Sequence, residues 1–356
     1  MKRASKVLVG MLLGIASLGL FGTAEAQDRD DRTGGTEVDW GWWPGPTPPE
    51  ARDALMKGPW PSERDLERIA ELAPQKPVVA PADSRRVLVW GRLWAHRGNA
   101  YCQEAVKIIG RESGAFDVVG TDDPRALLPE SLQGFDAIFW NSLHTARPFL
   151  PQNWKELPPD ELAEAKRLDA AVKESILKFV AADGKGIVGV VGSLAAFHDW
   201  PPYREMMGAY YGGHYHTDMV IQLEDPDHPL VACFNGKPLE ISSFGYLPGE
   251  PFSRDRLRVL LSLDMTKTPN PAELEGQEWL KSNVERVEGD FAISWVRPHG
   301  KGRVFYVALG YNPRDYFNPV FLRYLLAGTQ FAVGDLPGDT TPSGEDTAPR
   351  WDSGGE

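Results

Sequence analysis

The chain has 356 residues, of which 42% are hydrophobic, and its 38 Lys and Arg against 50 Asp and Glu give a formal net charge of -12. This apolar content supports a sizeable core and excludes a wholly disordered or collagen-like protein. The acidic balance argues against nucleic acid or anionic lipid as the main partner, because phosphate binding needs clustered Lys and Arg. We therefore expect neither a nucleic-acid partner nor a membrane partner.

The N-terminus has the pattern of a secretory signal. Three basic residues precede an apolar run over residues 7–21, and Ala24 and Ala26 supply the small side chains that a signal peptidase reads. The run is shorter than the ~20 residues needed to span a bilayer, and no Cys follows the cleavage point to take a lipid. Residues 1–26 are therefore predicted to be a signal peptide, and the mature protein to be exported, periplasmic or extracellular.

Only two cysteines are present, Cys102 and Cys233, and they lie far apart in the sequence. An exported protein can form disulfides, so the two residues could pair. The alternative is that each is a small side chain buried on its own. We favour the unpaired alternative.

Composition divides the remaining chain into three parts. Residues 27–82 include a Trp- and Pro-rich stretch at 40–49, whose prolines disfavour helix and sheet, so this part is expected to be either an extended arm against the domain or an unstructured tether. Residues 336–356 are rich in Gly, Pro, Asp, Thr and Ser without periodicity, which predicts a disordered tail. Residues 83–335 are enough for one large domain.

The first half of this domain alternates short apolar runs with helical patterns. Strands are expected at residues 86–90, 116–119, 136–140 and 187–191, and helices at 100–112 and 160–182. The run at 187–191 has no polar interruption, as expected for a strand covered on both faces. This βαβ rhythm predicts a parallel sheet between helices, with its ligand site at the carboxyl ends of the strands.

The second half is richer in strands. They are expected at residues 219–223, 239–242, 257–263, 291–296 and 303–309, followed by a closing helix at 319–333. The turn at 298–302 separates the last two strands, which predicts a hairpin.

Four motifs in this order resemble those of the ThuA-like (trehalose utilisation) family. They are residues 184–189, residues 197–201 with Tyr203, Gly208, Gly213 and His214, residues 224–230, and residues 300–306 with Leu309 and Gly310. The resemblance runs from about residue 85 to residue 334. It implies a flavodoxin-like three-layer α/β sandwich with a mostly parallel sheet, related to class I glutamine amidotransferases, and an association with carbohydrate metabolism.

Three polar positions of that family pattern differ in this chain. The amidotransferase relatives carry a nucleophilic Cys at the elbow after the central strand, and ThuA-like members usually have His there, but the matching residue here is Val191. The family's Asp-Glu pair before a Tyr falls on Ser243 and Phe244, with the Tyr kept as Tyr246. A family His near the end is replaced by Tyr311.

Two histidines are the candidate catalytic residues. His96 follows the first strand, at the edge where doubly wound sheets bind ligands, and it matches a His that the family often has. His214 is, by resemblance, a pocket residue above the strand ends. An imidazole can act as acid or base near pH 7. The alternatives are a loop His that caps the next helix, for His96, and a loop His bonded to backbone, for His214.

The spacing of His214 and His216 would also suit a metal, since alternate residues of a strand point the same way. Two ligands do not make a metal site, and nothing in the spacing selects a third. We therefore predict neither a metal nor another cofactor; the Gly-rich segments at 184–186 and 212–213 lack the spacing of nucleotide-binding loops.

Four residues are candidates for binding a sugar. Asn141 ends the third strand, where its amide could bind a hydroxyl, or else cap a turn. Trp200 and Tyr311 lie on expected strand-end loops, and aromatic rings stack on the C–H faces of sugars. Tyr246 joins them by resemblance. Trp200 has a structural alternative as well, at the start of a helix that Asp199 would cap.

The sequence thus predicts an exported ThuA-like protein that binds or processes a small-molecule carbohydrate, with His96 or His214 as acid or base. The alternative is a non-catalytic carbohydrate-binding or interaction module that has lost the reactive groups of its family. The sequence does not predict the number of subunits.

Overall fold

The computed structural model describes residues 61–91, 97–141, 143, 147–151, 153–197, 199–268 and 289–344. Only the backbone is described at 97, 214–217 and 242–244. The predicted signal peptide, the Trp- and Pro-rich stretch at 40–49 and the last twelve residues, 345–356, fall outside the described residues.

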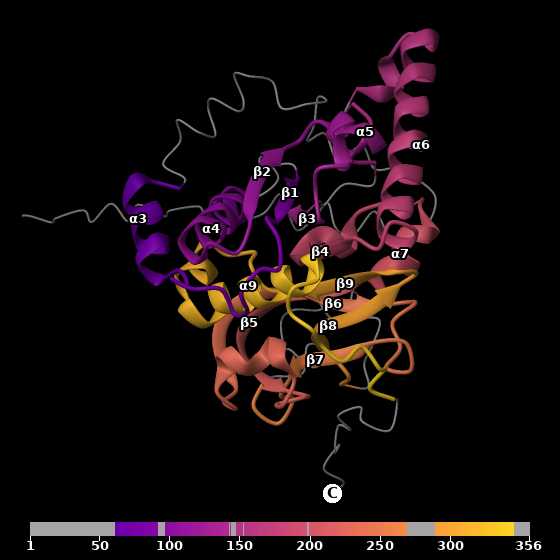
Figure 1. The fold of residues 1–356 in the computed structure, drawn as a ribbon. Coiled ribbons are helices and arrows are strands. Elements are labelled where there is room, and N and C mark those ends of the chain that lie inside the picture. The colour runs from indigo at the N-terminus through magenta and orange to yellow at the C-terminus, as the bar shows by residue number, and fades with distance from the viewer. Residues whose placement is uncertain are drawn as a thin grey trace, which may run out of the picture. The chain divides into compact units, whose positions relative to one another are not determined.

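A nine-stranded sheet forms the centre of the fold, in the order β2-β1-β3-β4-β9-β8-β7-β5-β6 (Figure 1). The first five strands in this order are parallel: β2 (Asp117–Thr121), β1 (Arg86–Trp90), β3 (Ala137–Asn141), β4 (Gly186–Val190) and β9 (Gly302–Val307). β3 and β4 are buried along their whole length, as their apolar runs predict. These five strands are the parallel half.

The other half of the sheet is antiparallel. It consists of β8 (Ala292–His299), β7 (Arg258–Leu263), β5 (Tyr210–Leu223) and β6 (Leu239–Gly249). β8 and β9 form the predicted hairpin and join the two halves. β5 and β6 are much longer than the strands predicted at 219–223 and 239–242. The additional residues, at the start of β5 and at the end of β6, include glycines and polar side chains, which interrupt the apolar pattern of a strand.

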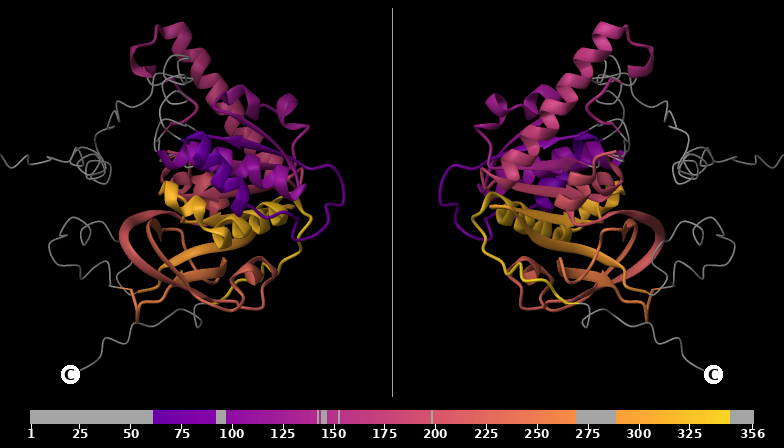
Figure 2. Two further views of the ribbon diagram at one scale, coloured as in Figure 1. Left: turned by 90° about the vertical axis from the view of Figure 1, so that its left-hand side faces the viewer. Right: turned by 90° about the vertical axis from the view of Figure 1, so that its right-hand side faces the viewer.

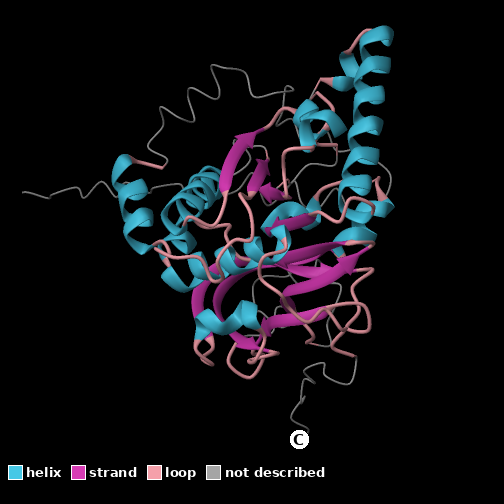
Figure 3. Cartoon of the chain, in the orientation of Figure 1, coloured by secondary structure: helices cyan, strands magenta, loops and turns pink. Residues whose placement is uncertain are grey.

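Helices cover both faces of the parallel half (Figures 1 and 3). The longer ones are α3 (Glu63–Leu72), α4 (Arg97–Ser113), α6 (Pro159–Ala181), α7 (Pro201–Met207) and α9 (Pro319–Val333), with α5 (Pro129–Leu132) as a single turn. Gly186 and Gly189, three positions apart on β4, lie on opposite faces of the sheet. A Cβ added at Gly186 would lie 2.0 Å from the Ala332 carbonyl oxygen of α9, and one at Gly189 would lie 2.4 Å from Met207 Cε of α7.

The helix–sheet–helix arrangement is the predicted flavodoxin-like α/β sandwich. α4 and α9 pack against each other on one face, and α6 and α7 contact the other. The predicted apolar stripe of α6 faces the core and includes the buried residues Val172, Ile176 and Phe179. Figure 2 shows α9, in yellow, between the parallel half and the strands of the antiparallel half.

Two segments differ from the sequence-based expectation. Residues 63–72, within the predicted arm, form α3, which contains no proline and begins with a capping box between Ser62 and Asp65. The tail is bound to the domain as far as Gly344: the Ser343 backbone N donates to the carbonyl of Leu257, just before β7, at 2.9 Å, and the Ser343 Oγ accepts from the Val259 backbone N of β7 at 3.0 Å. Pairing through backbone atoms leaves no signature in composition.

Cys102 and Cys233 are both unpaired, as expected. Among the described residues, no helix is long and apolar enough to cross a membrane.

Candidate functional site

The carboxyl ends of the parallel strands form one edge, which we call the strand-end edge. Asn141 at the end of β3 is the register partner of Val190 at the end of β4. Gly91, which follows β1, lies so close that a Cβ there would be 2.4 Å from the Asn141 carbonyl oxygen. On the other side of β4, a Cβ added at Gly310 would lie 3.2 Å from Val190 Cγ1. Doubly wound folds bind their ligands at this edge.

Val191 occupies a strained turn directly after the central strand β4. Its φ is +45°, in the left-handed region, where a β-branched residue is an outlier costing about 1–3 kcal/mol. The Tyr306 hydroxyl donates to its carbonyl oxygen at 2.9 Å, and its side chain is fully buried. The position therefore has the backbone of the elbow that the resemblance implied, but it carries an apolar side chain with no nucleophile.

Buried tyrosines support this turn. The Tyr203 hydroxyl donates to the Ser193 carbonyl at 2.8 Å, within the 3-10 helix η4 (Val191–Ala195) that continues from the elbow. Burial raises the pKa of both Tyr203 and Tyr306 well above the ordinary value, so both hydroxyls stay protonated as donors. The tyrosines hold the elbow in shape and supply no base.

Asn141 is fully buried and only partly satisfied. Its Nδ2 donates to the Asn99 carbonyl oxygen at 2.8 Å, so the side chain is tied to the first turn of α4. Its Oδ1 has no hydrogen-bond partner among the described residues. The side chain thus joins β3 to α4, rather than capping a turn, and this contact does not use its Oδ1.

The loop after β9 brings Tyr311 to the same place. A Cβ at Gly98, in the first turn of α4, would lie 2.1 Å from the Tyr311 carbonyl oxygen, so only glycine allows this approach. The loop is fixed by Asp315, whose Oδ2 accepts from the Gly310 backbone N at 3.0 Å, and by the Tyr316 hydroxyl, which donates to the Gly310 carbonyl at 2.8 Å. Asn141 and Tyr311 therefore both lie beside the start of α4.

His214 and Tyr246 are brought together by the long strands β5 and β6. The two residues are register partners, and both strands contact η4. Tyr246 is 4% exposed, and its ring meets that of Tyr211 edge to face with centroids 4.9 Å apart. The structure thus pairs the two predicted residues with each other on strands that contact η4; the His214 side chain lies outside the described residues.

Trp200 belongs to the core. Its ring is 7% exposed, stacks on Tyr203 at 5.5 Å and is covered by the Lys173 amine at 5.8 Å. Little of its face is left for a sugar. As the structural alternative proposed, Trp200 lies at the start of α7, directly before Pro201. Asp199 does not cap that helix; it forms an ion pair with Arg147 instead.

His96 lies outside the described residues, between Gly91 and the start of α4. His144 and His198 lie outside them as well. Within the described residues, no group of three His, Cys, Asp or Glu side chains is placed to hold a metal ion.

The motif at residues 224–230 supports the structure of the antiparallel half. Glu224 lies 3.3 Å from the guanidinium of Arg254, which is fully buried and also binds Asp290 at 2.9 Å. Asp225 pairs with Arg258 at 2.6 Å. Sequence reasoning missed these pairs, because a charged residue does not reveal its partner thirty positions away.

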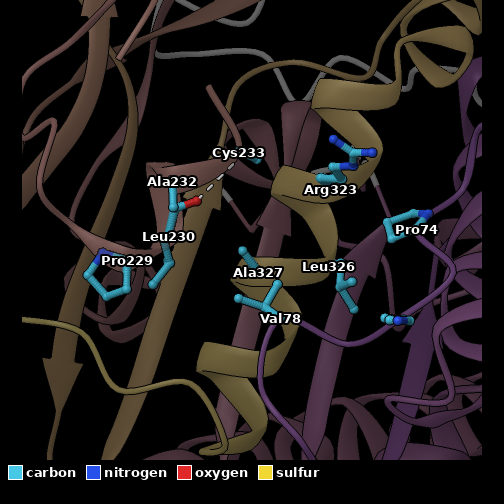
Figure 4. Close-up of a pocket in the computed structure, with 10 residues that line it drawn as sticks. Pro74, Val78, Pro229, Leu230, Ala232, Cys233, Arg323, Leu326 and Ala327 are labelled. Atoms are coloured by element: carbon cyan, nitrogen blue, oxygen red, sulfur yellow. Dashed lines mark hydrogen bonds between the residues drawn. The ribbon is translucent and has the colours of Figure 1, made fainter. Parts of the chain in front are cut away.

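A separate apolar groove of about 200 Å³ lies between α9 and residues 74–78 and 229–233 (Figure 4). Its lining residues include none of the candidates predicted from the sequence. Cys233 lines it, but burial raises the pKa of this thiol to about 12, so it is not a nucleophile at neutral pH. We therefore centre the candidate site on the strand-end edge.

The fold and the elbow define a class of protein: an α/β sandwich of the class I glutamine amidotransferase-like type. Residues 86–332 match the family described as ThuA, trehalose utilisation. This match spans more than half of the sequence, and the chain belongs to the ThuA family.

One solved structure agrees with this fold, and a second is reported for its similarity alone. A ThuA-like protein from Bacteroides uniformis has a TM-score of 0.52 at 16% identity, covering 71% of this chain and 92% of its own. A ThuA-like protein from Parabacteroides merdae has a TM-score of 0.43 at 16% identity, covering 74% of this chain and 99% of its own. No curated protein matches the sequence.

Proposed function

We propose that this protein binds a carbohydrate at the strand-end edge and processes it by acid–base chemistry through His96 and His214. The observation that carries this proposal is the elbow: Val191 keeps the left-handed turn of the fold class but has no nucleophile. A covalent intermediate at that position is therefore not available, whereas proton transfer by an imidazole needs none. Membership of a trehalose-utilisation family supports a sugar as the ligand.

The surroundings of the elbow support the same proposal. Asn141 and the main chain at Tyr311 provide hydrogen-bonding groups beside the strand ends. Sugar sites contain a few fixed polar groups of this kind. Trp200 and Tyr246 supply no stacking ring to this proposal, because both side chains are buried.

The test measures both binding and turnover. Trehalose, maltose, sucrose and glucose are screened by their effect on the melting temperature, and any sugar that binds is incubated with His96→Ala and His214→Ala. We expect either variant to abolish turnover while binding remains measurable. His299→Ala, on the β8–β9 hairpin, is the matched control and should leave both unchanged. Full turnover in both site variants would exclude the acid–base roles, and no effect of any sugar would exclude a carbohydrate function.

Val191 also favours a second candidate function, a non-catalytic carbohydrate-binding or interaction module. A site that has lost the reactive residue at its elbow can still keep its binding groups. The two functions differ in one result: under the second, the wild-type protein binds a sugar but leaves it chemically unchanged after prolonged incubation.

A further inference from the structure

The apolar groove beside α9 lies outside the site of the proposed function (Figure 4). Val78, Leu230 and Leu326 are among its lining residues. Val78 is 44% exposed and is one of two large hydrophobic residues that are exposed to such a degree among the described residues. With a volume of about 200 Å³, the groove has room for one large side chain. Covering it with a further apolar group would remove apolar surface from water, which is favourable.

Both walls of the groove are held in place by contacts within the domain. On one side, the buried Gln330 of α9 accepts from the Val78 backbone N at 2.7 Å and donates to the Val79 carbonyl at 2.7 Å. On the other side, the 3-10 helix η5 (Pro229–Phe234) packs against α9. The groove is therefore ordered before anything enters it, which lowers the entropy cost of filling it.

The side chains of the groove indicate the chemistry of its occupant. Its only charged lining residues are Lys76 and Arg323, both exposed, and the other described residues that line it are apolar. A sugar would bury hydroxyls against side chains that offer them no hydrogen bond. A basic segment would be repelled by the two like charges. The groove thus fits an apolar segment without Lys or Arg.

The chain itself carries such a segment at residues 41–49, which lie outside the described residues. The segment contains Trp42, Trp43 and four prolines, and it has no charged residue. An indole ring brings a large apolar area to a contact. Prolines restrict the backbone before it docks, so less conformational entropy is lost on binding.

The length of the connection suits docking within one chain. Residues 50–60 join the segment to Pro61, just before α3, and a random coil of these eleven residues spans about 17–20 Å. The ten residues of α3 rise about 15 Å, and Pro74 of the groove follows two positions after the helix ends. A linker whose length matches the span gives an effective concentration in the millimolar range. A separate partner would have to reach that concentration to compete.

We propose that residues 41–49 dock in the groove beside α9, with the indole of Trp42 or Trp43 against Val78 and Leu326. The Trp- and Pro-rich stretch is then an arm bound to its own domain, and the groove is the surface that receives it. This inference is independent of the carbohydrate function, because none of the residues proposed to bind or process the sugar lines the groove.

The experiment uses Cys233, which lines the groove, as a reporter in the full chain. Its rate of alkylation by iodoacetamide is measured at one fixed alkaline pH by peptide mass spectrometry, which separates it from the fully buried Cys102. A docked arm covers the thiol, so we expect the double variant Trp42→Ser, Trp43→Ser to react about tenfold or more faster than wild type. The protection in wild type should not change when the chain is diluted, because the arm and the groove belong to one molecule.

Trp60→Ser is the matched control, since it removes a tryptophan from the same part of the chain but outside the docking segment, and its rate should equal that of wild type. If Cys233 reacts too slowly to measure in every chain, Ala232→Cys, at an exposed lining residue, replaces it as the reporter with the same expectations. Equal rates in wild type and the double variant would overturn the inference. Protection that is lost on dilution would overturn it in favour of a second copy of the chain. An equal increase in Trp60→Ser would overturn the assignment to residues 41–49.

Discussion

The two halves of the sheet treat their buried polar groups in opposite ways. At the end of β3 in the parallel half, Asn141 Oδ1 has no hydrogen-bond partner among the residues that the structure describes, and Val191 follows β4 in a strained conformation. In the antiparallel half, the fully buried Arg254 is held between Asp290 and Glu224. Unsatisfied and strained groups are typical of functional sites, whereas satisfied buried ions hold a structure in place. The comparison gives the elbow and Asn141 in the parallel half the features of a functional site, and it gives the Arg254 network in the antiparallel half a supporting role.

The largest expected effect follows from removing the arginine of the ion network. Arg254→Leu leaves the carboxylates of Asp290 and Glu224 buried without their cation, which should lower the free energy of unfolding by about 3–5 kcal/mol. Urea unfolding measures this loss, and sugar affinity should stay unchanged because the network contains none of the residues proposed to bind or process the sugar.

The control for that variant is an exposed ion pair. Arg167 and Glu164 on α6 are about 70% exposed, so Arg167→Ala should change the free energy of unfolding by about 0–1 kcal/mol. A loss of stability as small as this in Arg254→Leu, or a loss of sugar affinity, would contradict the purely supporting role of the Arg254 network.

A smaller effect should come from the elbow. Val191 and Val188 are both fully buried and flank the end of β4, but only Val191 has a positive φ. Val191→Gly removes a buried side chain but relieves the strain of the left-handed conformation. Val188→Gly also removes a buried side chain, without any strain to relieve. We expect Val191→Gly to be the less destabilising of the two by about 1–3 kcal/mol, measured by urea unfolding. Equal losses would mean that the elbow stores no strain.

The sequence predicted the parallel half well for a physical reason. Its strands are buried on both faces, so the run at 187–191 and the stripe of α6 carry an unambiguous apolar pattern. β5 and β6 were predicted too short, because Gly212, Gly213 and Gly245 interrupt that pattern, while the strand pairing continues through Gly213 and Gly245 and bulges only at Gly212. α3 was missed because its neighbours are rich in proline, although the helix is not.

The candidate site was predictable only in part. The position of Asn141 followed from the end of an apolar strand, but its bond to Asn99 depends on how α4 packs, which no local pattern states. Trp200 was expected on a binding loop, and its burial against Tyr203 and Lys173 depends on α6 and α7 meeting there. Residue type indicates which hydrogen bonds and ring contacts a side chain can make, while tertiary packing decides which of them remain available to a ligand.

The smallest effect is a pH dependence confined to the antiparallel half. His228 Nδ1 accepts from the Leu230 backbone N at 3.3 Å, so its Nε2 carries the proton and donates to the Asp339 carbonyl at 3.0 Å, binding residues near the C-terminus to η5 (Pro229–Phe234). Burial, the largest influence, lowers the pKa of His228 below its ordinary 6.5, and Arg258 lowers it further, against the opposing effects of the Asp339 carbonyl and of Asp225.

Because the folded-state pKa of His228 is below 6.5, the unfolded chain binds more protons than the folded one as the pH falls past that value. The contribution of His228 to stability is therefore complete above pH 6.5 and is lost as the pH falls through the folded-state pKa. Burial also lowers the pKa of His299, so the pH dependence of wild-type stability contains contributions from both histidines.

His228→Gln removes the titrating group. The variant should lose about 1 kcal/mol of stability at pH 7.5 through the altered hydrogen bonds. Between pH 7.5 and 5.5 it should lose less further stability than wild type does. His299→Gln is the matched control: the two variants should each remove part of the slope, and an unchanged slope in His228→Gln would show that the contact with Asp339 does not depend on the neutral imidazole.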